Sequence, residues 1–234
     1  MTAARGSFSA VAGRLFAGGF GVLQRLRHPR PVHPHGVALQ GTMRFLTGST
    51  PTGVEILDHP PAAEIAVTAR ASRSLGVPAP LPDVIGLAVR LGAPAGPADV
   101  LFASTGFGVP SRFWLAFQRS PSRARFTTLF PYRSARGPVL LAARTIEPGN
   151  LSTEPGELAA ALERTTWRLR LYSASPTGLW HPFAVLELGR VAGSPLDTTD
   201  RYDPVRNPLP GSDWYPWARR AREPSYARAQ ERSS

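Results

Sequence analysis

Proline and glycine interrupt this chain so often that they limit what it can fold into. The sequence contains 25 prolines and 22 glycines among 234 residues, and they recur between short apolar segments along most of its length. Proline removes a backbone donor and glycine weakens a helix, so long uninterrupted helices are disfavoured. Many short strands joined by turns fit this punctuation better, and such strands build sandwiches or barrels.

Alternating apolar and polar side chains locate the expected strands between the turns. They occupy residues 36–46, 54–61, 63–72, 85–92, 98–105, 127–134, 138–148, 167–174 and 182–191. Residues 154–165 are rich in helix formers and predict a short helix, and residues 111–118 fit either a helix or a strand. The regular spacing predicts a mainly β fold, a closed antiparallel β-barrel of about eight strands with room for one ligand at its mouth.

The two ends of the chain depart from the strand pattern. Apolar side chains within residues 6–27 recur near helical spacing, which predicts an amphipathic N-terminal helix over residues 1–27. Arg14 interrupts the apolar run and argues against a signal peptide. The helix can pack on its own domain, on a partner subunit or on a membrane surface, and the first is the favoured interpretation. Residues 28–234 then form one barrel domain that ends in a C-terminal helix.

Composition excludes several classes of site. The chain has no cysteine, which rules out disulfides, thiolate catalysis, iron–sulfur clusters and haem ligation through cysteine. No stretch reaches the roughly 20 apolar residues of a membrane helix. The lack of cysteine does not indicate a compartment. Our expectation is a cytoplasmic protein, and surface contact with a membrane through residues 6–27 is left open.

The positive charge comes from a single residue type. The formal net charge is +11, and all 27 basic residues are arginine. A basic balance can indicate nucleic acid or an anionic membrane as a partner. The arginines are scattered, however, apart from clusters at 25–30, 119–125 and 218–222, and no nucleic-acid-binding signature accompanies them. We therefore expect no nucleic-acid partner.

Several short motifs occur in a fixed order over almost the whole chain. They are RPVHPHG (30–36), TARAS (68–72), PDVIGLAVRL (82–91), ADVL (98–101), YDPV to LPG (202–211) and REPSY (222–226). Each motif alone is common by chance. Their joint order and spacing resemble those of the haem-dependent catalases, which implies a catalase-like barrel that binds haem b.

The resemblance assigns the two faces of the haem. It implies that His33 stands on the distal side and that Ser72 hydrogen-bonds it. It also implies that Tyr226 is the proximal iron ligand, with Arg222 one helical turn earlier. A phenol has an ordinary pKa near 10, so a neighbouring guanidinium is needed to keep the ligand ionised at neutral pH. A distal imidazole can take a proton from peroxide and return it to the leaving oxygen.

Other positions complete the implied haem site, and one departs from it. Arg30 and Arg70 match the arginines that neutralise haem propionates. Phe113 is the candidate for the haem-stacking phenylalanine. Ala103 fills the position of the distal asparagine that polarises peroxide in the family, so one polar contact to peroxide is missing.

The function implied is that of a catalase-related peroxidase. We expect a haem b oxidoreductase that acts on hydrogen peroxide or organic hydroperoxides, with peroxidatic work favoured over fast dismutation because of Ala103. Family members usually assemble, so a homo-oligomer is compatible with the resemblance. The alternative is a barrel that binds haem or an apolar small molecule and has lost catalase activity.

Overall fold

The computed structural model describes residues 36–94 and 96–220, which all belong to one compact unit. Ten strands are present among these residues. They are β1 (Gly36–Phe45), β2 (Ile65–Arg73), β3 (Ile85–Ala93), β4 (Gly96–Ser104), β5 (Arg125–Thr127), β6 (Tyr132–Ser134), β7 (Gly137–Glu147), β8 (Trp167–Ala174), β9 (His181–Gly189) and β10 (Asp213–Trp214). The helical segments described are α2 (Glu55–Asp58), η1 (Ser111–Phe113), η2 (Pro121–Arg123) and α3 (Pro155–Leu162).

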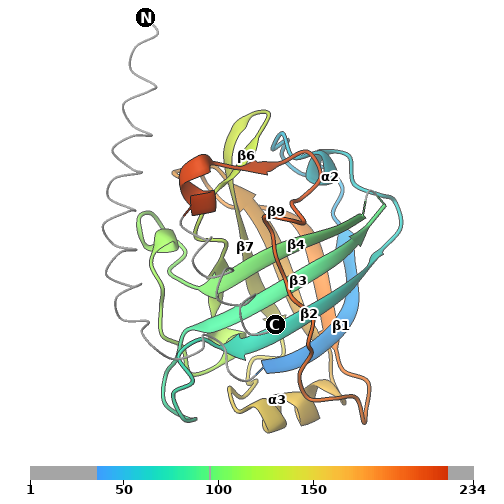
Figure 1. Cartoon of the computed structure of the whole chain (residues 1–234), viewed down its shortest axis with the longest axis vertical. Helices are drawn as coiled ribbons and strands as arrows, with labels where there is room; N and C mark the ends of the chain where they lie inside the picture. The colour runs from blue at the N-terminus through green and yellow to red at the C-terminus, as the bar shows by residue number, and fades with distance from the viewer. Residues whose placement is uncertain (1–35, 95, 221–234) are drawn as a thin grey trace, which may run out of the picture. The chain divides into compact units, whose positions relative to one another are not determined.

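The strands close into a ring. Their order is β7-β5-β4-β3-β2-β1-β9-β8, and β8 pairs again with β7, so eight strands form a closed antiparallel barrel. β6 and β10 lie outside the ring and extend the sheet from the beginning of β7. The predicted barrel of about eight strands is confirmed, and Figure 1 shows β1 to β4 as the wall nearest the viewer.

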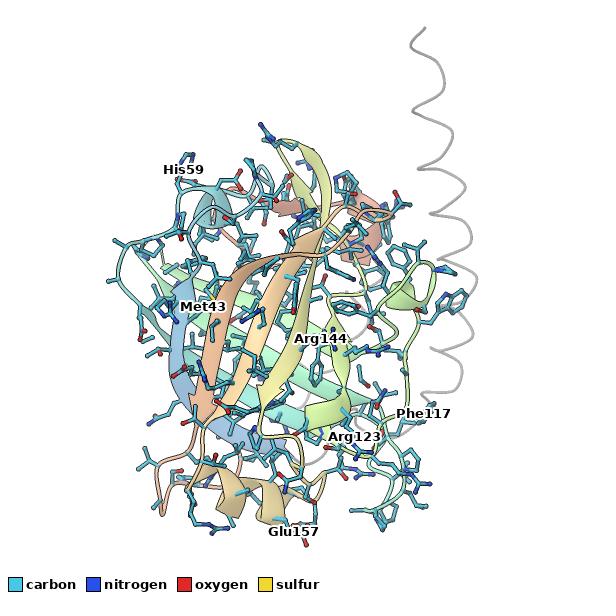
Figure 2. All side chains as sticks on the ribbon, turned by 180° about the vertical axis from the view of Figure 1, so that it is seen from behind. Met43, His59, Phe117, Arg123, Arg144 and Glu157 are labelled. Carbon is cyan, nitrogen blue, oxygen red and sulfur yellow. The ribbon has the colours of Figure 1, made fainter. Side chains whose placement is uncertain are left out.

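Apolar side chains fill the barrel interior. Along each long strand the alternate residues that point inward are buried, as the pattern of β2 shows. Met43, Leu87, Trp167 and Leu186 are fully buried members of this core. Met43 is labelled in Figure 2. The expected ligand position at the barrel mouth stays a prediction.

One expected strand is a helix. Residues 54–61 contain α2, in which the adjacent Ile56 and Leu57 are both buried. Two neighbouring buried residues fit a helical turn rather than a strand, whose side chains alternate. The Asp58 carboxylate accepts hydrogen bonds from the Thr52 and Gly53 N–H groups at 2.7 Å and holds this turn. The helix expected over 154–165 is observed as α3, where the Glu154 side chain caps the N-terminus.

The predicted terminal helices lie mostly outside the described residues. This holds for the whole N-terminal helix at 1–27. At the other end, residues 216–220 are helical and the rest of the predicted C-terminal helix is outside the described range. Within the part of the chain that the structure describes, no helix is long and apolar enough to cross a membrane.

After β9 the chain crosses the outer face of the β1–β4 wall. We call residues 190–207 the strap. The Leu196 carbonyl accepts a hydrogen bond from the Ala38 N–H at 2.9 Å, and the Asn207 carbonyl accepts one from the Asp99 N–H at 2.8 Å. The strap therefore runs from β1 to β4, in front of the wall in Figure 1.

Candidate functional site

Outward-facing residues of β1 to β4 form rows across the wall. One row consists of small residues that pair in register from strand to strand, namely Gly36, Ser72, Gly86 and Ala103. Their inward neighbours, including Leu87 and Phe102, belong to the core. Gly36 and Gly86 are buried, and Ser72 and Ala103 are half-buried, so the row is a largely covered strip of the wall with the Ser72 hydroxyl as its polar group. We call these four residues the small-residue row.

Ser72 lies near the end of β2, at the end of the barrel where β1 starts. Its Cα partner on β1 is Gly36, and His33 precedes Gly36 by three residues in the sequence. A cavity of about 20 Å³ lined by Ser72, Gly36 and Leu158 lies beside it, and this volume suits about one water molecule. The structure thus brings Ser72 next to the strand that His33 leads into, while His33 itself is outside the described residues.

Arg70 has a carboxylate partner that the sequence did not reveal. Its guanidinium donates to the two oxygens of Asp197 on the strap, with both distances 2.7 Å. The Gly36 N–H also donates to Asp197, at 2.9 Å. Gly36 leaves the space for this arrangement, because a Cβ there would lie 2.5 Å from the Arg70 Cζ. The predicted propionate-binding arginine is therefore engaged in holding the strap.

The Asp197 carboxyl is stabilised in its charged form. Burial alone would raise its pKa, but the hydrogen bonds and charge of Arg70, together with two backbone N–H groups, hold the pKa below its ordinary value. No feature of the sequence around Asp197 marks it as a partner of Arg70, since the two residues are 127 positions apart.

A second buried carboxylate anchors the other end of the strap. Asp99 is fully buried and accepts from the Arg90 guanidinium at 2.7 and 2.9 Å. It also accepts from the Asp203 N–H at 2.7 Å and the Asn207 side-chain amide at 2.8 Å. Asp99 and Asp203 belong to two of the motifs that carry the catalase resemblance. In this structure those motifs dock the strap on the wall.

Tyr202 packs between the strap and the wall. Its ring lies under the Arg90 guanidinium, with 5.1 Å from the Cζ to the ring centre. Burial raises the pKa of the Tyr202 phenol, and a hydrogen bond with Thr68 offsets only part of that effect. The phenol therefore stays neutral at ordinary pH and contributes packing and a hydrogen bond to the wall.

A larger hollow than the one beside Ser72 lies farther along the same wall. It is a groove of about 780 Å³, lined mainly by small and apolar groups, and its polar members are Gln40, Thr42, Thr68, Arg90 and Arg190. We call it the outer groove. Its volume falls within the range of sites that hold small molecules. Because Thr68 and Ser72 are four residues apart on β2, the outer groove and the small-residue row are separate parts of one wall.

The remaining predicted site residues are not gathered by the described structure. Phe113 lies in η1, within the connection between β4 and β5, and its haem-stacking role stays a prediction. The proposed iron ligand and its neighbours fall outside the described ranges, and these are Arg30, His33, Arg222 and Tyr226. Among residues 36–94 and 96–220, no group of three or more histidine, aspartate or glutamate residues could hold a metal ion.

Comparisons with known proteins leave the family open. No protein-family model matches the chain, and a search of curated proteins finds no similar sequence. The likeness to the haem catalases therefore stays a prediction that rests on the motifs and their spacing.

Proposed function

We propose that this chain is a haem b protein that acts on hydrogen peroxide or organic hydroperoxides, with the haem lying on the outer face of the β1–β4 wall. The observation that carries the proposal is the position of Ser72 in the small-residue row, paired with Gly36 just after His33. The resemblance implies that Ser72 supports the distal histidine, and the pairing of Ser72 with Gly36 is compatible with that role.

The shape of the wall suits a flat ring. Four neighbouring strands at their usual spacing give a width of about 14 Å, similar to that of a porphyrin. Glycine at 86, alanine at 103 and serine at 72 keep side chains short. The Arg70 guanidinium and Asp197 occupy the space over Gly36, and Gly86 is buried, so a planar group would reach the backbone only after this pair moves aside. A wall that carried leucine or arginine in this row would hold a flat ligand away from Ser72.

The chain's own residues supply the acid–base chemistry. Three residues span at most about 10 Å, so His33 has the reach to face Ser72 across the small-residue row. Its imidazole takes the proton of the hydroperoxide and returns it to the leaving oxygen, while Ser72 fixes the imidazole tautomer. Arg222 keeps the Tyr226 phenol ionised. If bound, haem would supply the two electrons for cleavage of the O–O bond, and a reducing co-substrate would have to return them.

Two features of the wall limit the reaction. Ala103 lies in the small-residue row and offers only a methyl group, so it cannot hydrogen-bond a peroxide. Arg70 is paired with Asp197, and a haem propionate would compete with that carboxylate. Both features support slow peroxidatic work more than fast dismutation.

A second candidate function has its own observation. The outer groove is large enough for a small apolar ligand and lies apart from Ser72. It supports the alternative of a non-catalytic barrel that carries haem or an apolar molecule. Thr42→Trp places a large side chain in this groove. If the carrier function is right, this variant should lose ligand binding. If haem binds at the small-residue row, haem binding should be unchanged.

Absorption spectroscopy of the full-length protein tests the iron ligand. Titration with haemin should give a Soret band, and Tyr226→Phe should weaken binding and shift the band, because it removes the phenolate. Tyr215→Phe, a partly exposed tyrosine in the same region of the sequence, is the matched control and should leave the spectrum unchanged. If Tyr226→Phe has the spectrum of the unmodified protein, the ligand assignment is wrong.

Turnover and blocking variants test the distal face. His33→Ala should lower hydroperoxide turnover about 100-fold, as expected for loss of a general acid–base group, while His59→Ala should have no effect. Ala103→Trp should block haem binding, whereas Arg170→Trp, which places the same indole at an exposed position of β8, should not. Turnover no higher than that of free haem would favour the carrier function.

A further inference from the structure

Three arginines face one another on the wall opposite the strap. Arg125 on β5 pairs in register with Arg144 on β7, and Arg144 pairs with Arg170 on β8. All three side chains are exposed. We call them the arginine row, and Figure 2 labels Arg144 on β7 in the view from behind. Directly opposed like charges destabilise a sheet, so the row has an unfavourable electrostatic energy in the protein alone.

The arginine row has no anionic partner in the described structure. Among residues 36–94 and 96–220, no carboxylate forms an ion pair with Arg125, Arg144 or Arg170, and no acceptor binds their guanidinium groups. The neighbouring Arg168 on β8 does have partners, Glu147 at 2.7 Å and Glu187 at 3.0 Å. The three guanidinium groups of the row therefore have N–H donors available to an external anion.

An aromatic stack connects the row to two loops. The Arg144 guanidinium lies over Phe107 at 5.2 Å, Phe107 stacks on Trp180 at 5.1 Å, and the Arg112 guanidinium lies over Trp180 at 4.4 Å. The Trp180 indole N–H donates to the Phe107 carbonyl at 2.7 Å. Residues 105–118 and 175–180 are thus packed against each other beside the arginine row, and the stack orders Arg144.

These two loops carry large apolar side chains into solvent. The exposed fractions are 51% for Val109, 57% for Trp114, 59% for Phe117 and 80% for Leu179. We call these four residues the loop patch. Val109 and Leu179 lie on the two loops that the stack joins, whereas Phe117 lies farther along its segment, beside Gln118, which pairs with Asp83.

We propose that the arginine row and the loop patch together bind the surface of an anionic lipid bilayer. The arginines contact lipid phosphates and carboxylates, while the loop patch inserts between the headgroups. A single-stranded nucleic acid fits less well, because Val109 and Leu179 have no aromatic face on which a base can stack. This surface is separate from the β1–β4 wall, and the proposal does not depend on haem.

Vesicle sedimentation with the full-length protein tests the proposal. The protein should bind vesicles of phosphatidylcholine with phosphatidylserine and bind pure phosphatidylcholine much less. The variant R144Q/R170Q should lower the partition coefficient about fivefold for each arginine removed. The matched control R44Q/R206Q removes the same charge at positions that are also exposed, and it should lower binding little.

The apolar contribution is tested separately. Leu179→Ser should lower partitioning severalfold, whereas Val191→Ser, an aliphatic residue exposed to a similar degree as Val109, should not. Each variant is first checked for an unchanged unfolding midpoint, and Trp114→Ser is the replacement if Leu179→Ser fails. Equal binding of R144Q/R170Q and the unmodified protein would overturn the proposal. The proposal would also be overturned by a second result. In it, the unmodified protein binds single-stranded RNA but no vesicles, and R144Q/R170Q loses the RNA binding.

Discussion

On the β1–β4 wall every outward-facing arginine has a carboxylate partner, whereas the arginine row on the β5–β7–β8 wall has none among the described residues. Arg70 and Arg90 are held by Asp197 and Asp99. Arg125, Arg144 and Arg170 face one another instead. The barrel thus uses one residue type in two opposite electrostatic environments.

The strap accounts for this difference. It crosses the β1–β4 wall and places Asp197 over Arg70, and its backbone and side chains complete the shell around Asp99. Arg70 and Arg90 are consequently neutralised by ion pairs within the fold. On the other wall the charges remain available to a partner, so the surface that costs electrostatic stability is also the surface that can bind an anion.

The largest expected effect comes from removing the buried carboxylate of the first wall. Asp99→Ala leaves Arg90, the Asp203 N–H and the Asn207 amide without their common acceptor. Breaking a buried charged network of this kind costs about 3 kcal/mol of the free energy of unfolding. Urea denaturation measures the loss. A change below about 0.5 kcal/mol, the usual effect of a surface substitution, would show that the strap is not anchored there.

The sequence predicted the barrel better than the strap, for a physical reason. Strand alternation is local, so β1 to β4 and β7 to β9 could be placed from neighbouring residues. The partner of Arg70 could not, because Asp197 lies in an irregular segment distant in sequence. The strand predicted over residues 54–61 was wrong, because a short apolar run fits a strand or a helical turn equally well. The arginine row required the register of three strands, which no local pattern contains.

A smaller effect is expected at the other anchor of the strap. Asp197→Asn keeps the side-chain shape and one acceptor but removes the charge that pairs with Arg70. Since Asp197 remains partly exposed to solvent, we expect a loss of about 1 kcal/mol at neutral pH. Arg70→Gln should destabilise to a similar extent, and the double variant should cost less than the sum of the two. Additive losses would mean that the pair does not hold the strap.

The same pair predicts a pH dependence. The pKa of Asp197 is lowered in the folded protein, so its contribution is present above the unfolded value near 3.9 and is lost as the pH falls through the folded pKa. The difference in unfolding free energy between the unmodified protein and Asp197→Asn should therefore shrink below about pH 4. A difference that is constant between pH 7 and pH 3 would assign the effect to shape rather than charge.

The smallest expected effect has the opposite sign and lies on the second wall. Arg144→Gln removes the central charge of the arginine row, which relieves repulsion from Arg125 and Arg170 but loses the contact with Phe107. Cross-strand like-charge pairs cost a few tenths of a kcal/mol each, so we expect a gain of about 0.5 kcal/mol at low salt. Added salt should stabilise the unmodified protein more than the variant, because screening weakens the same repulsion. A loss of stability that salt does not change would mean that the stacking of Arg144 on Phe107 outweighs the repulsion, and that the row is maintained by the fold rather than kept for a partner.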